Sequence, residues 1–416
     1  MLRTTREKVL RSTRTSSTFA SLRHRNFRLW FFGQMTSMMG TWMQWVAQGW
    51  LVYQITGSDL ALGTISFFGS LPTLFLMIPA GAIIDRVSKR AVLLIAQTGM
   101  MLAAFALAFL AWRDVLQVWH IGALAFAVGI CNSFDAPARQ AMVVDMVDDR
   151  QDLMNAVAMN STLFNVARIV GPAIAGVVLA TVGAAWCFCL NGISFLAVII
   201  ALLLMRLPTF EAKQHTEPLL QQLATGFRYV RGNKVVLTII GVIAVSSLFG
   251  FSYATLMPAY AADVLHVSET GLGALNAAVG IGALIASLIV ASTSSSRHTA
   301  TMLTVGNLLF PAALIALALS RSLYFSLLCL ALIGFAFMIQ NTTANTLIQN
   351  MVSDELRGRV MAFYTVSFFG TAPFAALQAG VVAEALGPAM GIAVGAVVAL
   401  AFSVFVFFTV PELRRV

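Results

Sequence analysis

The sequence has few charged residues, and acidic residues are the scarcer kind. Its 416 residues hold 26 lysines and arginines against 17 aspartates and glutamates, so that only 10% of the chain is charged while 59% is hydrophobic. Because a soluble protein is about 25% charged, this chain cannot cover itself with a water-facing surface, which excludes a soluble fold. Disorder is excluded as well, since disordered segments are poor in the apolar residues that dominate here.

The sequence also lacks the short motifs that mark enzymes. It contains no His-Glu-x-x-His zinc motif, no phosphate-binding loop and no Gly-x-Ser-x-Gly elbow. Of its four cysteines, Cys187 and Cys189 lie in an apolar run, where packing is a simpler interpretation than a metal site or a disulfide. We therefore expect no enzymatic activity, no cofactor and no metal, and any transport would use a gradient or be passive.

Long apolar runs are what the sequence has in abundance. A helix needs about 20 apolar residues to cross a hydrocarbon core about 30 Å thick. Runs of this length form helices, because barrel strands are only about 9–11 residues long. The pattern predicts an all-α membrane protein with twelve transmembrane helices, at about 28–53, 61–82, 91–112, 118–139, 156–181, 184–205, 235–259, 271–292, 300–320, 323–346, 360–384 and 388–410.

The longest predicted connection, 206–234, separates two sets of six helices. Ser58-Asp59-x-x-Leu62-Gly63 recurs as Ser268-Glu269-x-x-Leu272-Gly273, and Met146-Val147-x-Asp149 recurs as Met351-Val352-x-Asp354. Such recurrence indicates parallel repeats, whose interface near the midplane is where transporters bind substrate. The predicted parts are a tail (1–27), a six-helix bundle (28–205), a linker (206–234), a second six-helix bundle (235–410) and a short tail (411–416).

Within the linker, apolar residues recur at helical spacing opposite two arginines. Leu220, Leu223, Phe227 and Val230 form the apolar face, and Arg228 and Arg231 lie opposite. This pattern predicts an amphipathic helix at the membrane interface. A flexible linker is the alternative.

The net charge of +9 is distributed unevenly along the chain. Of the 26 basic residues, 23 fall on one side of the predicted helices, Arg113 and Arg321 fall on the other, and Arg168 lies inside a helix. Short cytoplasmic loops carry the excess of lysine and arginine. We therefore expect both termini in the cytoplasm, a multi-pass protein in the lipid of the inner (cytoplasmic) membrane, and no nucleic-acid partner, since no basic patch on a soluble domain is predicted.

One face of the first predicted helix is polar. A polar stripe suits a wet cavity better than lipid, because burying an unpaired polar group costs free energy. Interhelical hydrogen bonding is the alternative. The stripe consists of Gln34, Ser37, Thr41, Gln44 and Gln48, with Trp45 beside it as an apolar contact, and we predict that it lines a substrate cavity.

The end of the fourth predicted helix carries a similar stripe, Asn132, Asp135 and Arg139. The equivalent stretch of the second half includes Gln340 and Asn341. We predict that Asn132, Gln340 and Asn341 line the cavity. A helix end in water is the alternative, and it explains Asp135 and Gln340 poorly.

Arg168 lies about 12 residues into the fifth predicted helix, about 18 Å deep at 1.5 Å per residue. An arginine at this depth costs about 2.5–3.5 kcal/mol even on the lenient insertion scale, and it usually faces the bundle interior with a partner. Since Asp135 is the only acid well inside a predicted helix, we hypothesise that the two residues pair and that Asp135 carries a coupling proton. A structural pair, or an arginine bound by carbonyl groups, is the alternative.

Two motifs carry a resemblance to a known family. Gly81-Ala-Ile-Ile-Asp85-Arg86-Val-Ser-Lys89-Arg90 follows the second predicted helix and resembles the Gly-x-x-x-Asp-Arg-x-Gly-Arg-Arg signature of the major facilitator superfamily, with Ser88 in place of a glycine. Gly171-Pro172-Ala-Ile-Ala-Gly176 in the fifth resembles the Gly-Pro motif of its antiporter branch. The resemblance implies gating roles for Gly81, Asp85, Arg86, Arg90, Gly171 and Pro172, and we expect Gly81 to permit close packing.

The opening Arg25-Asn26-Phe27-Arg28-Leu-Trp30 and the stretch Asp135-Ala-Pro137-Ala-Arg139-Gln140 are similar to the bacterial subgroup of enterobactin (siderophore) exporters and macrolide-type efflux proteins. The resemblance implies a secondary transporter that exports amphipathic small organic molecules by proton antiport, with alternating access between its halves. We expect it to be a monomer. An uptake symporter or uniporter and a non-transporting membrane sensor are the alternatives.

Overall fold

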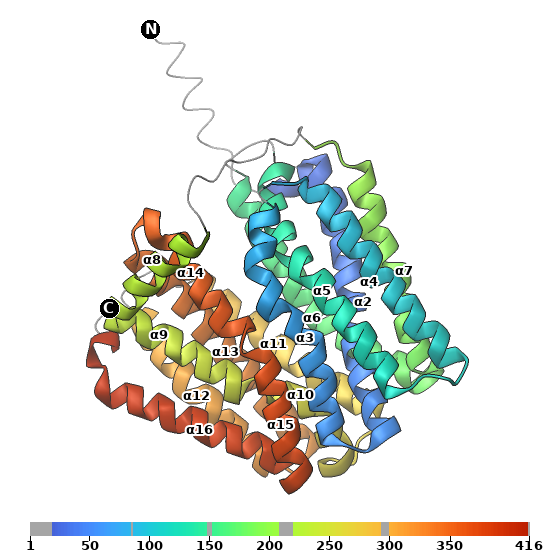
Figure 1. Cartoon of the computed structure of the whole chain (residues 1–416). Coiled ribbons are helices and arrows are strands. Elements are labelled where there is room, and N and C mark those ends of the chain that lie inside the picture. The colour runs from blue at the N-terminus through green and yellow to red at the C-terminus, as the bar shows by residue number, and fades with distance from the viewer. Residues whose placement is uncertain (1–18, 85, 148–151, 208–218, 293–298, 415–416) are drawn as a thin grey trace.

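The protein is described from a computed structural model, which covers residues 19–84, 86–147, 152–207, 219–292 and 299–414. Over these ranges the regular structure is entirely helical (Figure 1). The chain is an all-α membrane protein, as the apolar runs predicted. The helices are α2 (Arg25–Thr56), α3 (Asp59–Ile84), α4 (Lys89–Trp112), α5 (Val118–Met142), α6 (Leu153–Val182), α7 (Ala184–Leu204), α8 (Leu219–Gly232), α9 (Lys234–Val245), α10 (Tyr253–Ala259), α11 (Glu269–Ser292), α12 (Thr299–Leu319), α13 (Leu323–Met351), α14 (Asp354–Phe369), α15 (Ala372–Leu386) and α16 (Pro388–Thr409).

Eleven helices in the described part of the chain are long and apolar enough to cross a membrane. Two of these are composite: Lys234–Val264 joins α9 and α10, and Asp354–Leu386 joins α14 and α15. The remaining long helix is α2, with 32 residues, whose polar stripe lowers its hydropathy. Counting α2 with the eleven gives the predicted twelve.

Large apolar side chains stay exposed on many of these helices. Ile95 is 75% exposed, Leu288 is 63% exposed and Phe405 is 61% exposed. Exposed apolar surface of this extent suits lipid and not water. The packing inside the molecule therefore accounts for only part of the hydrophobic sequence.

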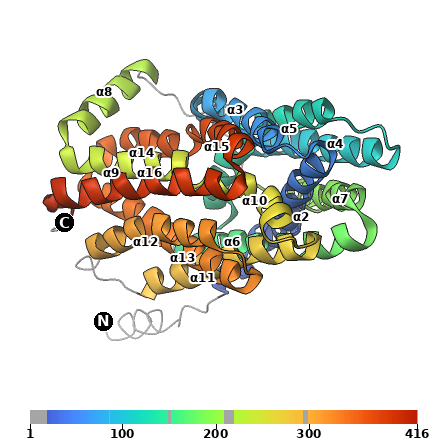
Figure 2. The ribbon, with the colours of Figure 1, turned by 90° about the horizontal axis from the view of Figure 1, so that it is seen from below.

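The helices form two groups that lie side by side, α2–α7 and α9–α16 (Figures 1 and 2). In the first group α2 packs on α6 and α7, and α3 packs on α5. In the second, α13 packs on α11 and α12, and α12 packs on α16. The groups meet where α3 lies against α15 and where α6 lies against α11. We call the end at which α2 begins and α16 ends the termini end, and the opposite end the distal end.

Two helices of the second group are interrupted. Between α9 and α10 the chain takes a π-helical turn, Ser246–Gly250, and the hydroxyl of Ser247 donates to the carbonyl of Phe368 at 2.7 Å. Gly370 and Thr371 separate α14 from α15. π-turns often lie at functional sites. The π-turn next to Phe251 therefore makes this part of the second group a candidate for a functional site.

The linker contains a helix, α8, that packs on α14. The rings of Phe227 and Phe363 lie 6.1 Å apart, and Val230 is only 4% exposed. A side chain at Gly226 would meet the Cβ atom of Arg359 at 3.1 Å. The predicted helix therefore forms and uses part of its apolar face against the protein. The side chains of Leu220 and Leu223 lie outside the described residues.

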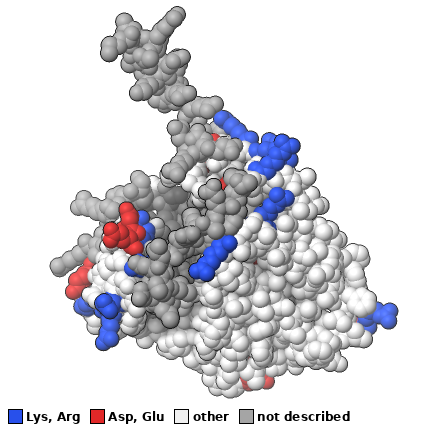
Figure 3. Space-filling view, turned by 45° about the horizontal axis from the view of Figure 1, so that its top comes forward, with Lys and Arg blue, Asp and Glu red and all other residues white. Residues whose placement is uncertain are grey.

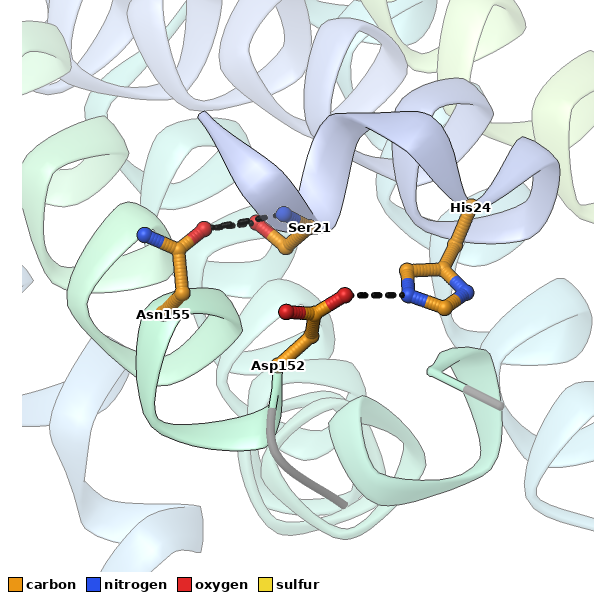
Figure 4. A network of polar contacts seen from close by, with 4 residues as sticks. All are labelled: Ser21, His24, Asp152 and Asn155. Atoms are coloured by element: carbon orange, nitrogen blue, oxygen red, sulfur yellow. Dashed lines mark hydrogen bonds and ion pairs between the residues drawn. The ribbon is translucent and has the colours of Figure 1, made fainter. Parts of the chain in front are cut away.

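The segment before α2 is fastened to the start of α6 (Figure 4). The backbone amide and the hydroxyl of Ser21 donate to Oδ1 of Asn155 at 2.9 and 2.7 Å. Nε2 of His24 lies 3.0 Å from Oδ2 of Asp152. These contacts fix the entry of α2 relative to α6 within the first group.

Candidate functional site

A cavity of about 300 Å³ lies between the two groups of helices. The first group supplies part of the predicted stripe of α2 and one face of α3, including Ser66 and Ser70. The second group supplies Phe251 and Thr255 next to the π-turn, and α15 supplies only small apolar side chains. The wall is therefore polar on the side of α2 and largely apolar opposite, which suits an amphipathic ligand.

The predicted stripe of α2 divides into two parts. Thr41, Gln44, Trp45 and Gln48 line the cavity between the two groups, and their contact with a substrate stays a prediction. Gln34 and Ser37 do not line it, since each is only 1% exposed and lies in the helix packing. That part of the prediction is wrong, because neighbouring helices cover the end of the stripe near the start of α2.

Asn191 is a cavity residue that the sequence analysis missed. Its Nδ2 atom donates to Oε1 of Gln44 at 2.6 Å, and its Oδ1 atom accepts from Ser194 at 3.1 Å. This network holds the Gln44 amide in place at the cavity wall. The available signal was a single amide in the apolar run of α7.

Asn132 and Asp135 lie on neighbouring turns of α5 but in different surroundings. Asn132 is exposed and lines the cavity. Asp135 is 3% exposed, accepts from Nε2 of Gln97 at 2.7 Å and lies 3.5 Å from Nε of Arg139. Its partners are thus an amide of α4 and an arginine of its own helix.

The hypothesis that Asp135 pairs with Arg168 is wrong for this conformation. Arg168 lies over the ring of Trp42, with the guanidinium carbon 5.8 Å from the ring centroid. Such a cation–π contact contributes about 0.5–2 kcal/mol, less than the cost of placing an arginine at this depth. Arg168 lines a recess of about 30 Å³ beside the cavity, together with Tyr253 and Asn276.

Gln340 and Asn341 do not line this cavity. Nε2 of Gln340 donates to Ser246 at 2.8 Å and to Asn307 at 3.1 Å inside the second group. Asn341 accepts from the hydroxyl of Tyr364. Their predicted place in the cavity wall is therefore wrong for this conformation, since both amides join helices of one group.

The loop motif that resembles the superfamily signature connects helices within the first group. Nη2 of Arg90 donates to the carbonyl of Leu203 at 2.8 Å, while Arg86 is exposed. A side chain at Gly81 would meet nothing within 4 Å, so the expectation of close packing there is wrong. Asp85 lies outside the described residues.

Gly171 and Pro172 lie at a close approach of three helices. A Cβ atom at Gly171 would stand 2.6 Å from Cβ of Trp42 and 2.7 Å from the carbonyl oxygen of Met39, both on α2. The carbonyl oxygen of Pro172 faces Gly273 of α11. The Gly-Pro pair therefore brings α6 close to a helix of its own group and to one of the other.

Two glycine crossings seal the distal end. A Cβ atom at Gly63 would lie 2.9 Å from Cα of Gly380, and one at Gly273 would lie 2.9 Å from Cα of Gly176. Gly63 and Gly273 occupy matching positions of the recurring motif, so the crossings are related by the internal repeat. Because glycine lets two backbones approach closely, α3 packs on α15 much as α11 packs on α6.

Hydrogen bonds between the groups reinforce this seal. Nε1 of Trp50 donates to Glu269 at 3.2 Å, the hydroxyl of Tyr53 donates to Asp263, and the hydroxyl of Ser58 donates to Glu384 at 2.8 Å. One apolar cluster also spans both groups here, whereas two separate clusters, one for each group, lie toward the termini end. The cavity is therefore closed distally.

Two repeated groups of membrane helices around a partly polar cavity define a class of protein, the secondary transporters of the major facilitator superfamily. The chain belongs to the family described as transmembrane secretion effectors, whose family model matches residues 16–415.

Three known transporters are similar to this chain in sequence over most of its length. A staphyloferrin A transporter of Staphylococcus aureus is 27% identical, with 86% of this chain and 90% of that protein covered. The multidrug efflux pump Tap of Mycolicibacterium fortuitum is 29% identical (86% and 88% covered), and the enterobactin exporter EntS of Escherichia coli is 25% identical (94% and 93% covered).

Two solved transporter structures have the same fold as this chain. A transporter of the POT family superposes with a TM-score of 0.75 at 12% identity, covering 94% of this chain and 96% of that one. A bacterial homologue of the lysosomal transporter Spinster gives 0.73 at 12% identity, covering 94% and 98%.

Proposed function

We propose that the protein exports amphipathic small organic molecules, siderophore-like or drug-like, across the cytoplasmic membrane. The observation that carries the proposal is the cavity between the two groups, polar on α2, apolar opposite and closed at the distal end. Two of the three relatives, a multidrug efflux pump and an enterobactin exporter, move their substrates outward, which supports this direction. Uptake on the same fold is the alternative.

The orientation rests on charge. Figure 3 shows most of the visible basic side chains toward the termini end, above a broad face on which few charged side chains appear. Because cytoplasmic loops carry the positive charge, we assign the termini end and both termini to the cytoplasm. The distal seal then faces outward, and the conformation is one in which the outside is closed.

The mechanism that we infer is alternating access. Residues 28–205 and 235–410 act as two bodies joined by the linker 206–234, and the distal glycine crossings separate when they rock. The protein acts as a monomer, without enzymatic activity, cofactor or metal. This scheme needs only the two bodies and a gradient.

Proton antiport is assigned to Asp135. Its carboxylate is buried near the cavity and bound by Gln97 and Arg139, so adding a proton would weaken the ion pair with Arg139. Loss of the ion pair would change the side-chain contacts of α5 one turn away from Asn132. Asn132 lines the cavity. Proton binding is thereby coupled to the cavity wall.

A deletion strain tests the direction and the class of substrate. We expect one or more amphipathic metabolites to build up inside the cells and to fall in the medium, with recovery when the gene is restored. The matched control restores the gene as Asp135→Asn. Depletion inside the cells, with a rise in the medium, would support uptake.

A further inference from the structure

Arg168 has a charge that no other side chain compensates. Over the ranges that the structure describes, its guanidinium has no hydrogen-bond acceptor and no carboxylate within ion-pair distance, and its one observed partner is the ring of Trp42. An arginine inside a membrane protein that lacks a partner indicates a functional site.

Among the described residues, the buried or partly buried acids make no ion pair with Arg168. Asp59, buried at the start of α3, has an Oδ1 atom without a hydrogen bond. Asp135 is held by Gln97 and Arg139. At the distal end, Glu269 accepts from Trp50, and the other two carboxylates of the seal likewise accept from donors of the first group. No described carboxylate supplies the counter-charge of Arg168 in this conformation, which leaves the position open to an anion that enters.

The recess around Arg168 is built to receive such a group. It shares Trp45, Phe251 and Ala254 with the main cavity, so the two volumes have walls in common. Its other polar lining residues come from the second group: Tyr253, and Asn276, whose Nδ2 atom donates one hydrogen to the carbonyl of Leu272 at 3.0 Å and has a second hydrogen to donate. A volume of about 30 Å³ suits one small polar group and not a whole molecule.

We propose that Arg168 binds an acidic group of the transported molecule, a carboxylate or a similar oxyanion, while the apolar remainder occupies the main cavity. The guanidinium fork matches a carboxylate with two parallel hydrogen bonds. Tyr253 and Asn276 donate from the opposite group, so the anion bridges the two bodies. This inference rests on the proposed function, and it narrows the substrates to amphipathic acids.

The test compares two probes that differ in one charge. Naphthaleneacetate and naphthaleneacetamide share an aromatic body, and at neutral pH only the first is an anion. The full chain in lipid nanodiscs is titrated with each by calorimetry. We expect the wild type to bind the carboxylate about tenfold more tightly than the amide, and Arg168→Gln to bind the two equally.

The amide serves as the folding control, because its affinity should be the same in the wild type and in Arg168→Gln. Arg168→Lys should keep part of the preference, since it keeps the charge and loses the fork. Arg113→Gln, an exposed arginine outside the cavity, should keep all of it. A wild type without preference, or a preference that survives Arg168→Gln, would overturn the inference and leave the cavity as a binding site. Failure of both probes to bind would contradict the binding role of the cavity, and the inference with it.

Discussion

Single polar residues inside this protein differ in whether they have a partner. Gln44 is held by Asn191, and Asp135 is held by Gln97 and Arg139. In the described part of the chain, by contrast, Oε1 of Gln34 is buried without a hydrogen bond. Because a buried polar group without a partner costs about 1–3 kcal/mol, the packing of α2 has to offset the unbonded oxygen of Gln34.

Asp135→Asn is expected to remove proton coupling and keep substrate exchange. The amide has nearly the same shape and accepts from Gln97, but it cannot gain or lose a proton. Counterflow of a substrate down its own gradient should stay near the wild-type rate, while movement driven by a pH gradient should fall to the background of empty membranes. Equal driven rates in the two proteins would remove Asp135 from the coupling.

Gly171→Ala is expected to destabilise the protein by about 1–3 kcal/mol. The new methyl group would stand less than 3 Å from Trp42 and from the backbone of Met39, so α2 or α6 must shift. Gly81→Ala is the matched control, because its methyl group meets nothing within 4 Å and alanine favours a helix. Thermal unfolding in detergent measures both, and equal midpoints would refute the close approach.

At the scale of helices, the distal crossings set the conformation. Gly63 and Gly380, like Gly176 and Gly273, let helices of the two groups touch along their backbones. The backbone contact of the seal is made of small residues, and opening it also breaks the hydrogen bonds that Glu269, Asp263 and Glu384 accept. The nearby carboxylates of the second group add directional hydrogen bonds to this packing, since each accepts from a donor of the first group.

Gly380→Val should shift the molecule toward a state that is open at the distal end. The larger side chain would clash with Gly63, and a clash of about 1–3 kcal/mol changes a two-state ratio about fivefold or more. A cysteine at Ser70, in the cavity wall of a protein freed of its native cysteines, reports the state through its reaction with a thiol reagent applied outside.

Gly241→Val is the control for this experiment, because a Cβ atom at Gly241 makes only an ordinary contact with Phe402 at 3.7 Å. It should leave the labelling rate unchanged. Labelling of Ser70→Cys from outside that is equally slow in all three proteins would contradict the role of the crossings as the seal.

The helices could be predicted from sequence because a run of about 20 apolar residues has one structural outcome in lipid. Their interruptions could not. The π-turn at Ser246–Gly250 accompanies a close approach in which a side chain at Gly395 would clash with the carbonyl of Phe249. Such a contact joins residues far apart in sequence, and no local pattern encodes it.

The candidate site could also be predicted only in part. Helical spacing gave the polar face of α2, but it could not say that neighbours cover Gln34 and leave Gln48 at the cavity. The ion-pair partner of Asp135 proved to be Arg139, one turn along its own helix, while Arg168 of α6 lies over the ring of Trp42. The apolar wall of the second group carries no signal in sequence, since it reads as ordinary membrane helix.

For the whole molecule, the two groups meet at one end and are packed separately at the other. In the orientation proposed above, with the basic end in the cytoplasm, this arrangement would be the state in which an exporter loads its substrate. Its conversion requires the distal crossings to open and the two bodies to close over the termini end. Asp135 and Arg168 lie in the first group, on helices that border the cavity and its recess.

The most direct test of export by proton antiport uses inverted membrane vesicles with the cytoplasmic face outward. Vesicles holding the wild type, Asp135→Asn or no transporter are incubated with a small-molecule extract of the cells, the lumen is acidified, and its contents are analysed by mass spectrometry. We predict that amphipathic acids accumulate only with the wild type, only while the lumen is acidic. Equal lumen contents in the three preparations, or accumulation that survives collapse of the pH gradient, would contradict the account.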